Sequence, residues 1–366
     1  MSDLIKILLL LATGLIARPV LAQVNKNAPG SRPASSFFER MDQAILSKEY
    51  PNIHSVLVMH KGKLVYEKYY AAKDEALGED LGIVTHSAET LHDLRSVTKS
   101  VVSIAIGIAI KQGKIKSEEE RVMKYFPSHN DLDTGLRSKL TIKHLLMMAS
   151  GMDWNENLPY TDTMNSEIAM SVSADPIRYI LSRPIVEEAG KTFSYNGGNT
   201  QLLAAIIETT CGISLDQFIN RFLFVPLGIT DFYWYKVSDK NNLVAAASGL
   251  RLRSRDMMKI GQLLLNNGLA DGKQIVDKVW VQKSLSKQIN RDKDGGYGYQ
   301  FWVLTAPGDN DKRPLPTAVG NGDQRIFIDR DKQLVVVVTS GNYNKWDVKK
   351  ASYELLNDFI YPALAR

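Results

Sequence analysis

Hydrophobic and polar residues alternate near the start of the chain, form long apolar runs in the middle and alternate again near the end. Residues 54–60 and 63–70 alternate and are rich in β-branched side chains, and Gly62 lies in the turn between them. This pattern predicts a β-hairpin. The C-terminal part predicts strands over 299–304, 325–328 and 333–339 and a final helix over 346–364.

The middle of the chain is predicted to be mostly helical. Residues 96–111 form a long apolar run that ends near Gly113, a candidate C-cap. Because this helix is hydrophobic on nearly all sides, we expect it to be central and buried. Shorter helices are predicted over 140–148, 201–208 and 255–267, and a first helix begins at Ser35 or Ser36.

Strands at both ends of a helical middle predict one antiparallel sheet built from both termini, in an α/β (α+β) domain of residues 35–366. Residues 35–92 and 290–366 would form the sheet lobe, with the first and last helices covering the sheet. Residues 93–289 would form an all-helical lobe. We expect the catalytic groups in the cleft between the helical lobe and the sheet.

The first 22 residues have the features of a secretory signal peptide, with a basic Lys6 and an apolar run over 7–16. The run is short for a membrane span and is followed by Arg18 and Pro19, although an uncleaved anchor is the alternative. Polar residues 23–34 would form a flexible leader. We therefore expect a periplasmic or secreted protein with no stable membrane span after signal removal.

Composition is that of an ordinary globular protein, with 44% apolar and 23% charged residues over 366 positions. The net charge of +5 comes from scattered basic residues, which argues against nucleic-acid binding. The six histidines have no ligand spacing such as HExxH, so neither a metal site nor a cofactor is predicted. Cys211 is the only cysteine, so no intramolecular disulfide can form, and we expect a buried thiol.

Two Ser-x-x-Lys sequences are candidates for a nucleophile and its activating lysine, Ser96 with Lys99 and Ser284 with Lys287. The second pair lies in a polar segment typical of a solvated helix end. The first pair begins the apolar helix, where i, i+3 spacing puts both side chains on one face and the free amide of Ser96 would be an oxyanion donor. Apolar surroundings would lower the pKa of Lys99 and let it act as a base. The alternative is a helix N-cap at Ser96 with a lysine that reaches toward solvent.

Two glycine-rich segments add further candidates. Residues 191–199 contain Tyr195, whose phenol would relay a proton between Ser96 and the leaving group, although a packed aromatic ring is the alternative. Residues 320–324 precede the predicted strand 325–328, and a glycine-rich strand edge lets a substrate approach the backbone closely. The alternative for this segment is a tight turn.

The order of these motifs resembles the β-lactamase-related serine hydrolases, which include class C β-lactamases, penicillin-binding DD-peptidases, serine esterases and 6-aminohexanoate-dimer hydrolases. The resemblance covers nearly all of residues 36–364, with similar segments at 94–103, 140–154, 193–208, 226–234 and 248–268. It implies that Ser96 is acylated and that Lys99 and Tyr195 share the roles of general base and general acid. It also implies an oxyanion hole made by the backbone amides of Ser96 and Gln324.

Two departures from the family pattern bear on the substrate. Gly197 replaces the Asn of the Tyr-x-Asn motif, and Asn321-Gly322-Asp323 replaces the Lys-Thr-Gly or His-x-Gly element. The usual cation is therefore missing, and Asp323 adds negative charge if it is ionised. Both changes argue against efficient hydrolysis of β-lactams or recognition of D-Ala-D-Ala. The predicted pocket residues are Asn196, Asn199, Asn321, Gly322 and Tyr160.

These features predict a hydrolase of small ester, amide or peptide-like substrates. One alternative is a DD-peptidase or β-lactamase that acts on peptidoglycan-like or β-lactam substrates. An alternative of another class is a non-catalytic peptidoglycan-binding module of the same fold, although the presence of Ser96, Lys99 and Tyr195 argues against it. The sequence carries no signal for the oligomeric state.

Overall fold

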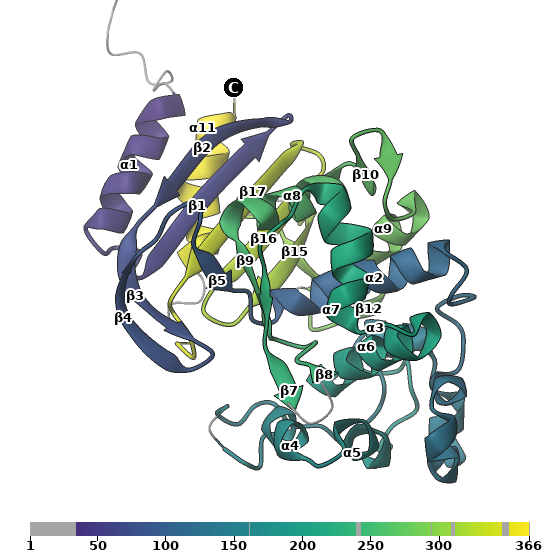
Figure 1. Cartoon of the computed structure of the whole chain (residues 1–366). Coiled ribbons are helices and arrows are strands. Elements are labelled where there is room, and N and C mark those ends of the chain that lie inside the picture. Colours follow the sequence, from purple (N-terminus) through teal and green to yellow (C-terminus); the bar gives the residue numbers. More distant parts are fainter. Residues whose placement is uncertain are drawn as a thin grey trace, which may run out of the picture.

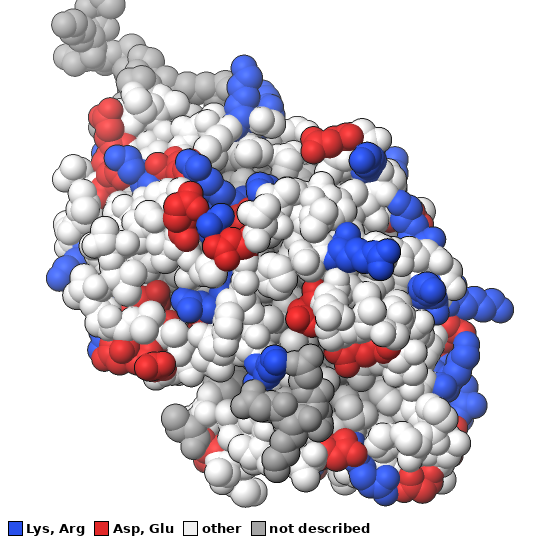
Figure 2. Space-filling model, in the orientation of Figure 1, with Lys and Arg blue, Asp and Glu red and all other residues white. Residues whose placement is uncertain are grey.

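The computed structural model describes residues 34–160, 162–238, 243–293, 295–308, 312–345 and 351–365 (Figure 1). The predicted signal peptide and residues 23–33 of the predicted leader lie outside these ranges. Within them, no single helix is long and apolar enough to cross a membrane, although the bent pair Gly197–Cys211 and Leu215–Leu227 passes by length and composition. Figure 2 shows acidic and basic side chains interspersed over one face of the molecule.

An eight-stranded antiparallel sheet combines strands from both ends of the chain, as predicted (Figure 1). The N-terminal hairpin joins the C-terminal strands through β1 and β17, where Val56 lies opposite Val338. Both strands are rich in β-branched residues, which pack well on a pleated, buried surface. In sheet order the strands are β12 (Ile289–Asn290), β13 (Gly296–Tyr297), β14 (Trp302–Thr305), β15 (Pro314–Gly320), β16 (Gln324–Asp329), β17 (Leu334–Ser340), β1 (Ile53–His60) and β2 (Lys63–Tyr69).

Helices from the two ends of the chain cover one face of this sheet. Phe38 and Met41 of the first helix and Phe359 of the last helical segment are buried in one cluster with Val58 and Val336 of the sheet. Burial of each such side chain contributes about 1.5–3 kcal/mol. Residues 346–350 of the predicted final helix lie outside the described ranges. The covering elements are α1 (Ala34–Leu46), α10 (Ala351–Leu355), η6 (Leu356–Ile360) and α11 (Tyr361–Leu364).

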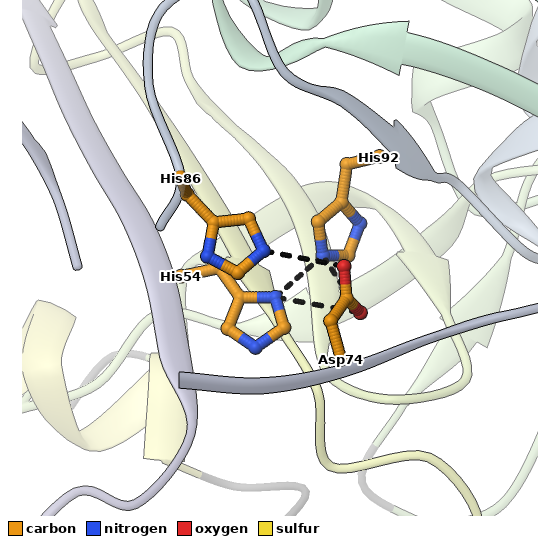
Figure 3. A group of neighbouring side chains, drawn as sticks. All are labelled: His54, Asp74, His86 and His92. Carbon is orange, nitrogen blue, oxygen red and sulfur yellow. Dashed lines mark hydrogen bonds and ion pairs between the residues drawn. The ribbon is translucent and has the colours of Figure 1, made fainter. Parts of the chain in front are cut away.

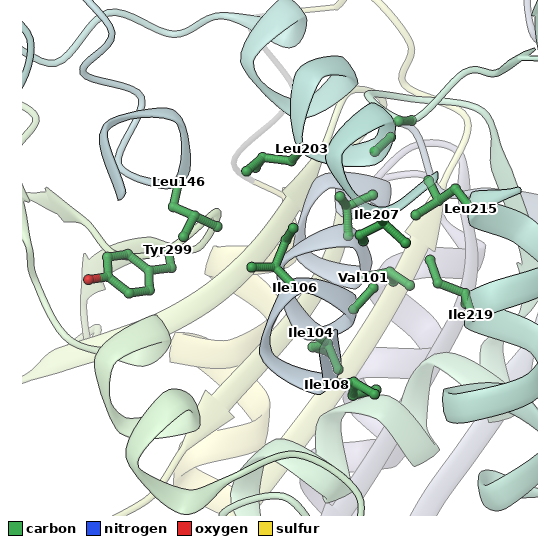
Figure 4. Packing of buried hydrophobic residues seen from close by; sticks show 14 of the residues in the cluster. Val101, Ile104, Ile106, Ile108, Leu146, Leu203, Ile207, Leu215, Ile219 and Tyr299 are labelled. Carbon is green, nitrogen blue, oxygen red and sulfur yellow. The ribbon is translucent and has the colours of Figure 1, made fainter. Parts of the chain in front are cut away.

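The opposite face of the sheet packs on the central helix α2 (Val97–Lys111) and on α8 (Ser254–Leu265). Of the 15 residues of α2, 13 are buried, which confirms the prediction from its all-round hydrophobicity (Figure 4). Two close approaches need glycine: an added Cβ would lie 2.3 Å from Trp280 at Gly107 and 2.5 Å from Val335 at Gly261. This packing makes the start of α2 a rigid base for any group placed there.

The remaining helices pack on α2 or on one another (Figure 1). The α-helices are α3 (Ile142–Leu146), α4 (Ser166–Val172), α5 (Pro176–Ser182), α6 (Gly197–Cys211), α7 (Leu215–Ile219) and α9 (Lys278–Leu285). Short 3₁₀ or π segments are η1 (Val122–Tyr125), η2 (Pro127–Leu132), η3 (Gly135–Lys139), η4 (Asn220–Phe224) and η5 (Val225–Leu227). Cys211, expected to be buried, is only partly so, because it lies at the end of α6 just before Gly212.

Small sheets within residues 93–289 correct the expectation of an all-helical lobe. Their strands have two to four residues, which is too short for alternation to be recognised in the sequence. They are β5 (Leu91–Asp93), β9 (Leu250–Arg253) and β6 (Tyr233–Trp234) in one sheet, with the pairs β7 (Lys236–Ser238) with β8 (Leu243–Val244), and β10 (Leu269–Ala270) with β11 (Lys273–Gln274). A further hairpin, β3 (Ala71–Ala76) with β4 (Glu79–Thr85), follows β2 and was not predicted either.

Candidate active site

Ser96 and Lys99 lie together at the start of α2. Lys99 Nζ donates one hydrogen bond to Ser96 Oγ at 3.2 Å and another to the carbonyl of Ala247 at 2.9 Å. The Ser96 side chain is partly exposed and makes no capping hydrogen bond to the helix. Lys99 is only 1% exposed. The pair therefore matches neither a simple N-cap nor a lysine that reaches into solvent.

The backbone just before Ser96 has an unusual conformation. Arg95 has a φ of 49°, in the left-handed region that costs a non-glycine residue about 1 kcal/mol or more. Its guanidinium pairs with Glu75 at 2.7 Å and Asp93 at 3.5 Å and lies 4.7 Å from the centre of the Tyr343 ring. These contacts fix the turn between β5 and α2, and with it the position of Ser96.

Tyr195 completes the triplet predicted from the sequence. It lies on the loop before α6. The ring centre is 4.9 Å from Lys99 Nζ and 5.7 Å from that of Trp302. The structure thus places the Tyr195 ring next to the Lys99 amine, which itself donates to Ser96 Oγ.

Two acidic residues that the sequence analysis did not single out lie beside this triplet. Glu156 accepts hydrogen bonds from Trp154 Nε1 at 2.5 Å and from the Gly197 amide, and Glu167 accepts one from Ser248 Oγ at 3.0 Å. A Cβ added to Gly197 would lie 2.8 Å from Glu167 and 2.9 Å from Glu156. The two carboxylates therefore fill the space that a larger side chain at this motif position would need.

These carboxylates change the electrostatics of Lys99. Burial lowers the pKa of its ammonium group, but Tyr195, Glu167 and Glu156 together raise that pKa more, so the net shift is upward. The predicted lowering of the lysine pKa is therefore wrong, because it considered the apolar helix and not the acidic neighbours. Burial also raises the pKa of Tyr195. At neutral pH, Lys99 is a buried ammonium and Tyr195 a neutral phenol.

Glu156 should make the protein less stable as the pH rises. Burial and the neighbouring Glu167 raise the pKa of its carboxyl from 4.5 to about 7. Because the folded state holds this proton more tightly than the unfolded state, the stabilising effect is complete below about pH 4.5 and is lost as the pH rises through about 7. Glu156→Gln keeps an accepting oxygen, and we expect its melting temperature to fall less between pH 5 and pH 8, by about 3 °C or more.

Melting curves of wild type, Glu156→Gln and the exposed control Glu49→Gln at both pH values check this expectation. The control should keep the pH dependence of wild type. An identical pH dependence in all three proteins would show that the Glu156 carboxyl titrates as it does in the unfolded chain.

The predicted strand-edge element is a tight turn between β15 and β16. A Cβ added to Gly320 would lie 2.3 Å from the carbonyl oxygen of Leu94, so this end of β15 lies against the segment that leads to the nucleophile. Gly322 has a φ of 87°, and a Cβ there would lie 2.5 Å from the Tyr343 ring. Gln324 pairs with Gly320 across the turn, and its buried side chain bonds to the backbone of β17. Its amide as the second oxyanion donor stays a prediction.

The polar side chains of this turn are bonded to other protein groups. Asn321 exchanges hydrogen bonds of 2.7 and 2.9 Å with Asn344. Asp323 is 1% exposed, pairs with Arg325 at 2.9 Å and accepts two hydrogen bonds from Ser352. The expectation that Asp323 adds negative charge to the substrate site is therefore wrong, because its carboxylate is buried in a separate cluster.

The other predicted pocket residues lie on either side of Tyr195. Asn196 and Asn199 are fully buried at the start of α6, where Asn196 Oδ1 caps the helix by accepting from the Asn199 amide at 3.1 Å. Tyr160 is partly buried and donates to Glu156 at 3.4 Å. Of these three residues, Tyr160 is the one whose side chain is both partly exposed and next to the acidic pair.

The second Ser-x-x-Lys sequence has a structural explanation. Ser284 is 2% exposed, not solvated as predicted, and its hydroxyl donates to the carbonyl of Trp280 in the same helix at 2.8 Å. Lys287 lies beyond the end of α9 and is exposed. Ser284 is thus bonded within α9, and Ser96 is the candidate nucleophile.

Known proteins with similar sequences include some that are named as hydrolases. The Beta-lactamase family matches residues 53–357. A 6-aminohexanoate-dimer hydrolase from Paenarthrobacter ureafaciens is 24% identical over 269 residues, which cover 68% of this chain and 66% of that relative. A putative D-alanyl-D-alanine carboxypeptidase from Escherichia coli K12 is 26% identical over 188 residues, which cover 50% of this chain and 42% of that relative. The chain thus spans less than two thirds of these relatives.

Solved structures show the same fold. A putative 6-aminohexanoate-dimer hydrolase from Bacillus anthracis has a TM-score of 0.70 at 22% identity, over 89% of this chain and 81% of that protein. EstCE1, a hydrolase with promiscuous acyltransferase activity, has a TM-score of 0.69 at 16% identity, over 88% and 98%. The predicted β-lactamase/transpeptidase-like fold is confirmed. With its family match over most of the length, the chain belongs to the Beta-lactamase family.

Proposed function

We propose that this chain is an exported hydrolase of small esters or amides that works through an acyl-enzyme on Ser96. The observation that carries the proposal is the buried Lys99 amine, whose Nζ donates to Ser96 Oγ at 3.2 Å and lies 4.9 Å from the centre of the Tyr195 ring. Export rests on the signal-like first 22 residues. The N-terminal sequence of protein recovered from the periplasm or the medium tests export, and a start at Gln23 is expected.

The reaction proceeds in two half-reactions. The Ser96 oxygen attacks the substrate carbonyl carbon, and its proton passes to the deprotonated form of the Lys99–Tyr195 pair. The same pair then protonates the leaving alcohol or amine as the carbonyl–heteroatom bond breaks. In the second half, water attacks the carbonyl carbon of the Ser96 ester and gives its proton to the pair. The pair returns a proton to Ser96 Oγ as the ester bond breaks, which releases the acid and the free serine. The Ser96 amide at the helix start stabilises the oxyanion in both halves.

The acidic pair beside the triplet bears on the substrate. Glu167 is buried and Glu156 is partly exposed next to Gly197, and Lys99 supplies one positive charge against their two carboxyls. A substrate with its own carboxylate near this point, such as a penicillin, would meet net negative charge when both glutamates are ionised. Neutral or cationic acyl groups are therefore preferred.

Intact mass spectrometry with p-nitrophenyl acetate and nitrocefin, alongside chromophore release, tests the proposal. We expect ester turnover with a transient acetyl adduct and little reaction with nitrocefin. Rapid nitrocefin hydrolysis would replace the substrate assignment with that of a β-lactamase. No adduct and no turnover with either compound would contradict the esterase proposal and favour the non-catalytic binding module.

A further inference from the structure

Three histidines and one aspartate that are not part of the catalytic triplet meet in the interior (Figure 3). His54 comes from β1, Asp74 from β3, His92 from β5, and His86 from the segment between β4 and β5. All four side chains are buried, and one ligand atom from each lies within 4.8 Å of all the others. Their separation along the chain, from residue 54 to residue 92, explains why no ligand spacing was visible in the sequence.

The outer nitrogen of every imidazole is bonded to a backbone carbonyl. Since a carbonyl only accepts hydrogen bonds, each outer nitrogen must carry a proton and donate it. The three bonds are His54 Nε2 to Lys73 O at 3.0 Å, His86 Nδ1 to Tyr70 O at 2.8 Å, and His92 Nδ1 to Asp93 O at 3.0 Å. In a neutral ring, the inner nitrogen therefore carries no proton and has a lone pair that can only accept a hydrogen bond or bind a metal ion. Such backbone contacts are also what orients histidines that ligate metals.

The inner atoms consequently face one another as acceptors. His54 Nδ1 lies 2.7 Å from His92 Nε2, and His86 Nε2 lies 3.2 Å from Asp74 Oδ2. Asp74 Oδ1 lies 3.7 Å from His54 Nδ1 and 3.9 Å from His92 Nε2. Acceptors this close repel one another unless something positive lies between them. Protons would have to bridge both short contacts, which places two imidazolium charges against one buried carboxylate, whereas a single divalent cation satisfies all four atoms.

We propose that His54, Asp74, His86 and His92 bind a divalent metal ion of the zinc class in a closed, four-coordinate site. Zinc bonds to nitrogen of about 2.0–2.1 Å in a tetrahedron place ligand atoms roughly 3.3 Å apart. The four separations of 2.7 to 3.9 Å given above fall on both sides of that value, and all four ligand atoms lie within 4.8 Å of one another. Imidazole and carboxylate are ordinary zinc ligands, and full burial of all four suits a structural ion.

The site is placed to support the nucleophile. Its ligand His92 lies four residues before Ser96, and its ligand Asp74 precedes Glu75, which pairs with Arg95 at 2.7 Å. Tyr343 donates to Asp74 at 3.2 Å, and its ring lies against both the Arg95 guanidinium and Gly322. The ion would therefore tie β1, β3 and β5 together beneath the turn that holds Ser96 in place.

Metal analysis of the full chain tests this inference. Protein produced with zinc in the medium and purified without chelator is expected to contain about one zinc ion per chain. Removal of the ion by a chelator should lower the melting temperature by about 5 °C or more, and added Zn²⁺ should restore it. Co²⁺ added to the metal-free protein should give the visible absorption of a four-coordinate cobalt site.

Variants identify the ligands. His86→Gln and Asp74→Asn are expected to lose the bound zinc and the cobalt absorption, while His60→Gln, at the other end of β1 from His54, keeps both. If the ligand variants do not fold, chelation and re-addition of zinc in wild type decide the question. Wild-type protein with less than about 0.1 zinc per chain, and no response of the melting temperature to Zn²⁺ or Co²⁺, would overturn the proposal and leave a proton-bridged cluster.

Discussion

Replacement of Ser96 by alanine is expected to lower kcat/KM for a p-nitrophenyl ester by about 10⁴-fold or more and to abolish the acyl adduct. The reason is geometric: Ser96 Oγ is the partly exposed hydroxyl that accepts a hydrogen bond from Lys99 Nζ at 3.2 Å, and we expect it to carry the acyl group. Because the side chain makes no capping hydrogen bond, the melting temperature should change little. Steady-state kinetics and intact mass measure both effects.

The matched control is Ser284→Ala, in the second Ser-x-x-Lys sequence. The Ser284 hydroxyl donates within its own helix, so its removal should leave kcat/KM within about twofold of wild type. Loss of activity in Ser284→Ala with retention in Ser96→Ala would reverse the assignment. Retention of activity in both would mean that a different residue is acylated.

Replacement of Lys99 by methionine is expected to lower kcat by about 10³-fold, since this change removes the amine that shares protons with Ser96 and Tyr195 but keeps most of the side-chain volume. In wild type, acidic neighbours raise the pKa of Lys99 and burial raises the pKa of Tyr195. Activity should therefore increase with pH through the neutral and mildly alkaline range, as the proton-accepting form becomes more populated. Lys99→Met should lose most of this increase.

Lys287→Met is the control for this variant, because Lys287 is an exposed lysine in the same motif context. It should keep both the rate and the pH profile of wild type. A Lys99→Met protein that retains more than about a tenth of wild-type activity would remove Lys99 from the proton-transfer step, and a flat wild-type profile would contradict the raised pKa of the pair.

The long elements of the fold were predictable because their hydrophobic patterns repeat over many residues. The hairpin over 54–70 and the apolar helix from residue 96 appear in the structure within a residue or two of the expected bounds. Strand β15 was missed because it contains Pro314 and Pro316, and proline is uncommon in sheets. Both prolines lie near the beginning of the strand, where proline is tolerated. The short strands of residues 93–289 are held by tertiary contacts, which leave no periodic trace in the sequence.

The triplet was predictable because Ser96, Lys99 and Tyr195 occur in recognisable motifs, whereas their electrostatic surroundings were not. Glu156 and Glu167 lie in a segment without a motif, and only the folded chain brings them beside Gly197. Asp323 illustrates the reverse case. It lies in the glycine-rich motif at the strand edge, where the sequence suggested a charge in the substrate site. In the structure its backbone has a left-handed φ of 74°, and its side chain is buried against Arg325 and Ser352.

The pairing of β1 with β17 also constrains how the protein is made. Residues 53–60 are synthesised well before their partner strand, 334–340. The central sheet cannot close until this strand is available, so the early hairpin waits with one edge unpaired. That order of events would suit the export proposed above, since a chain whose central sheet is still open can pass through a narrow pore. The unpaired strand edge is also a site at which an unfinished chain can aggregate.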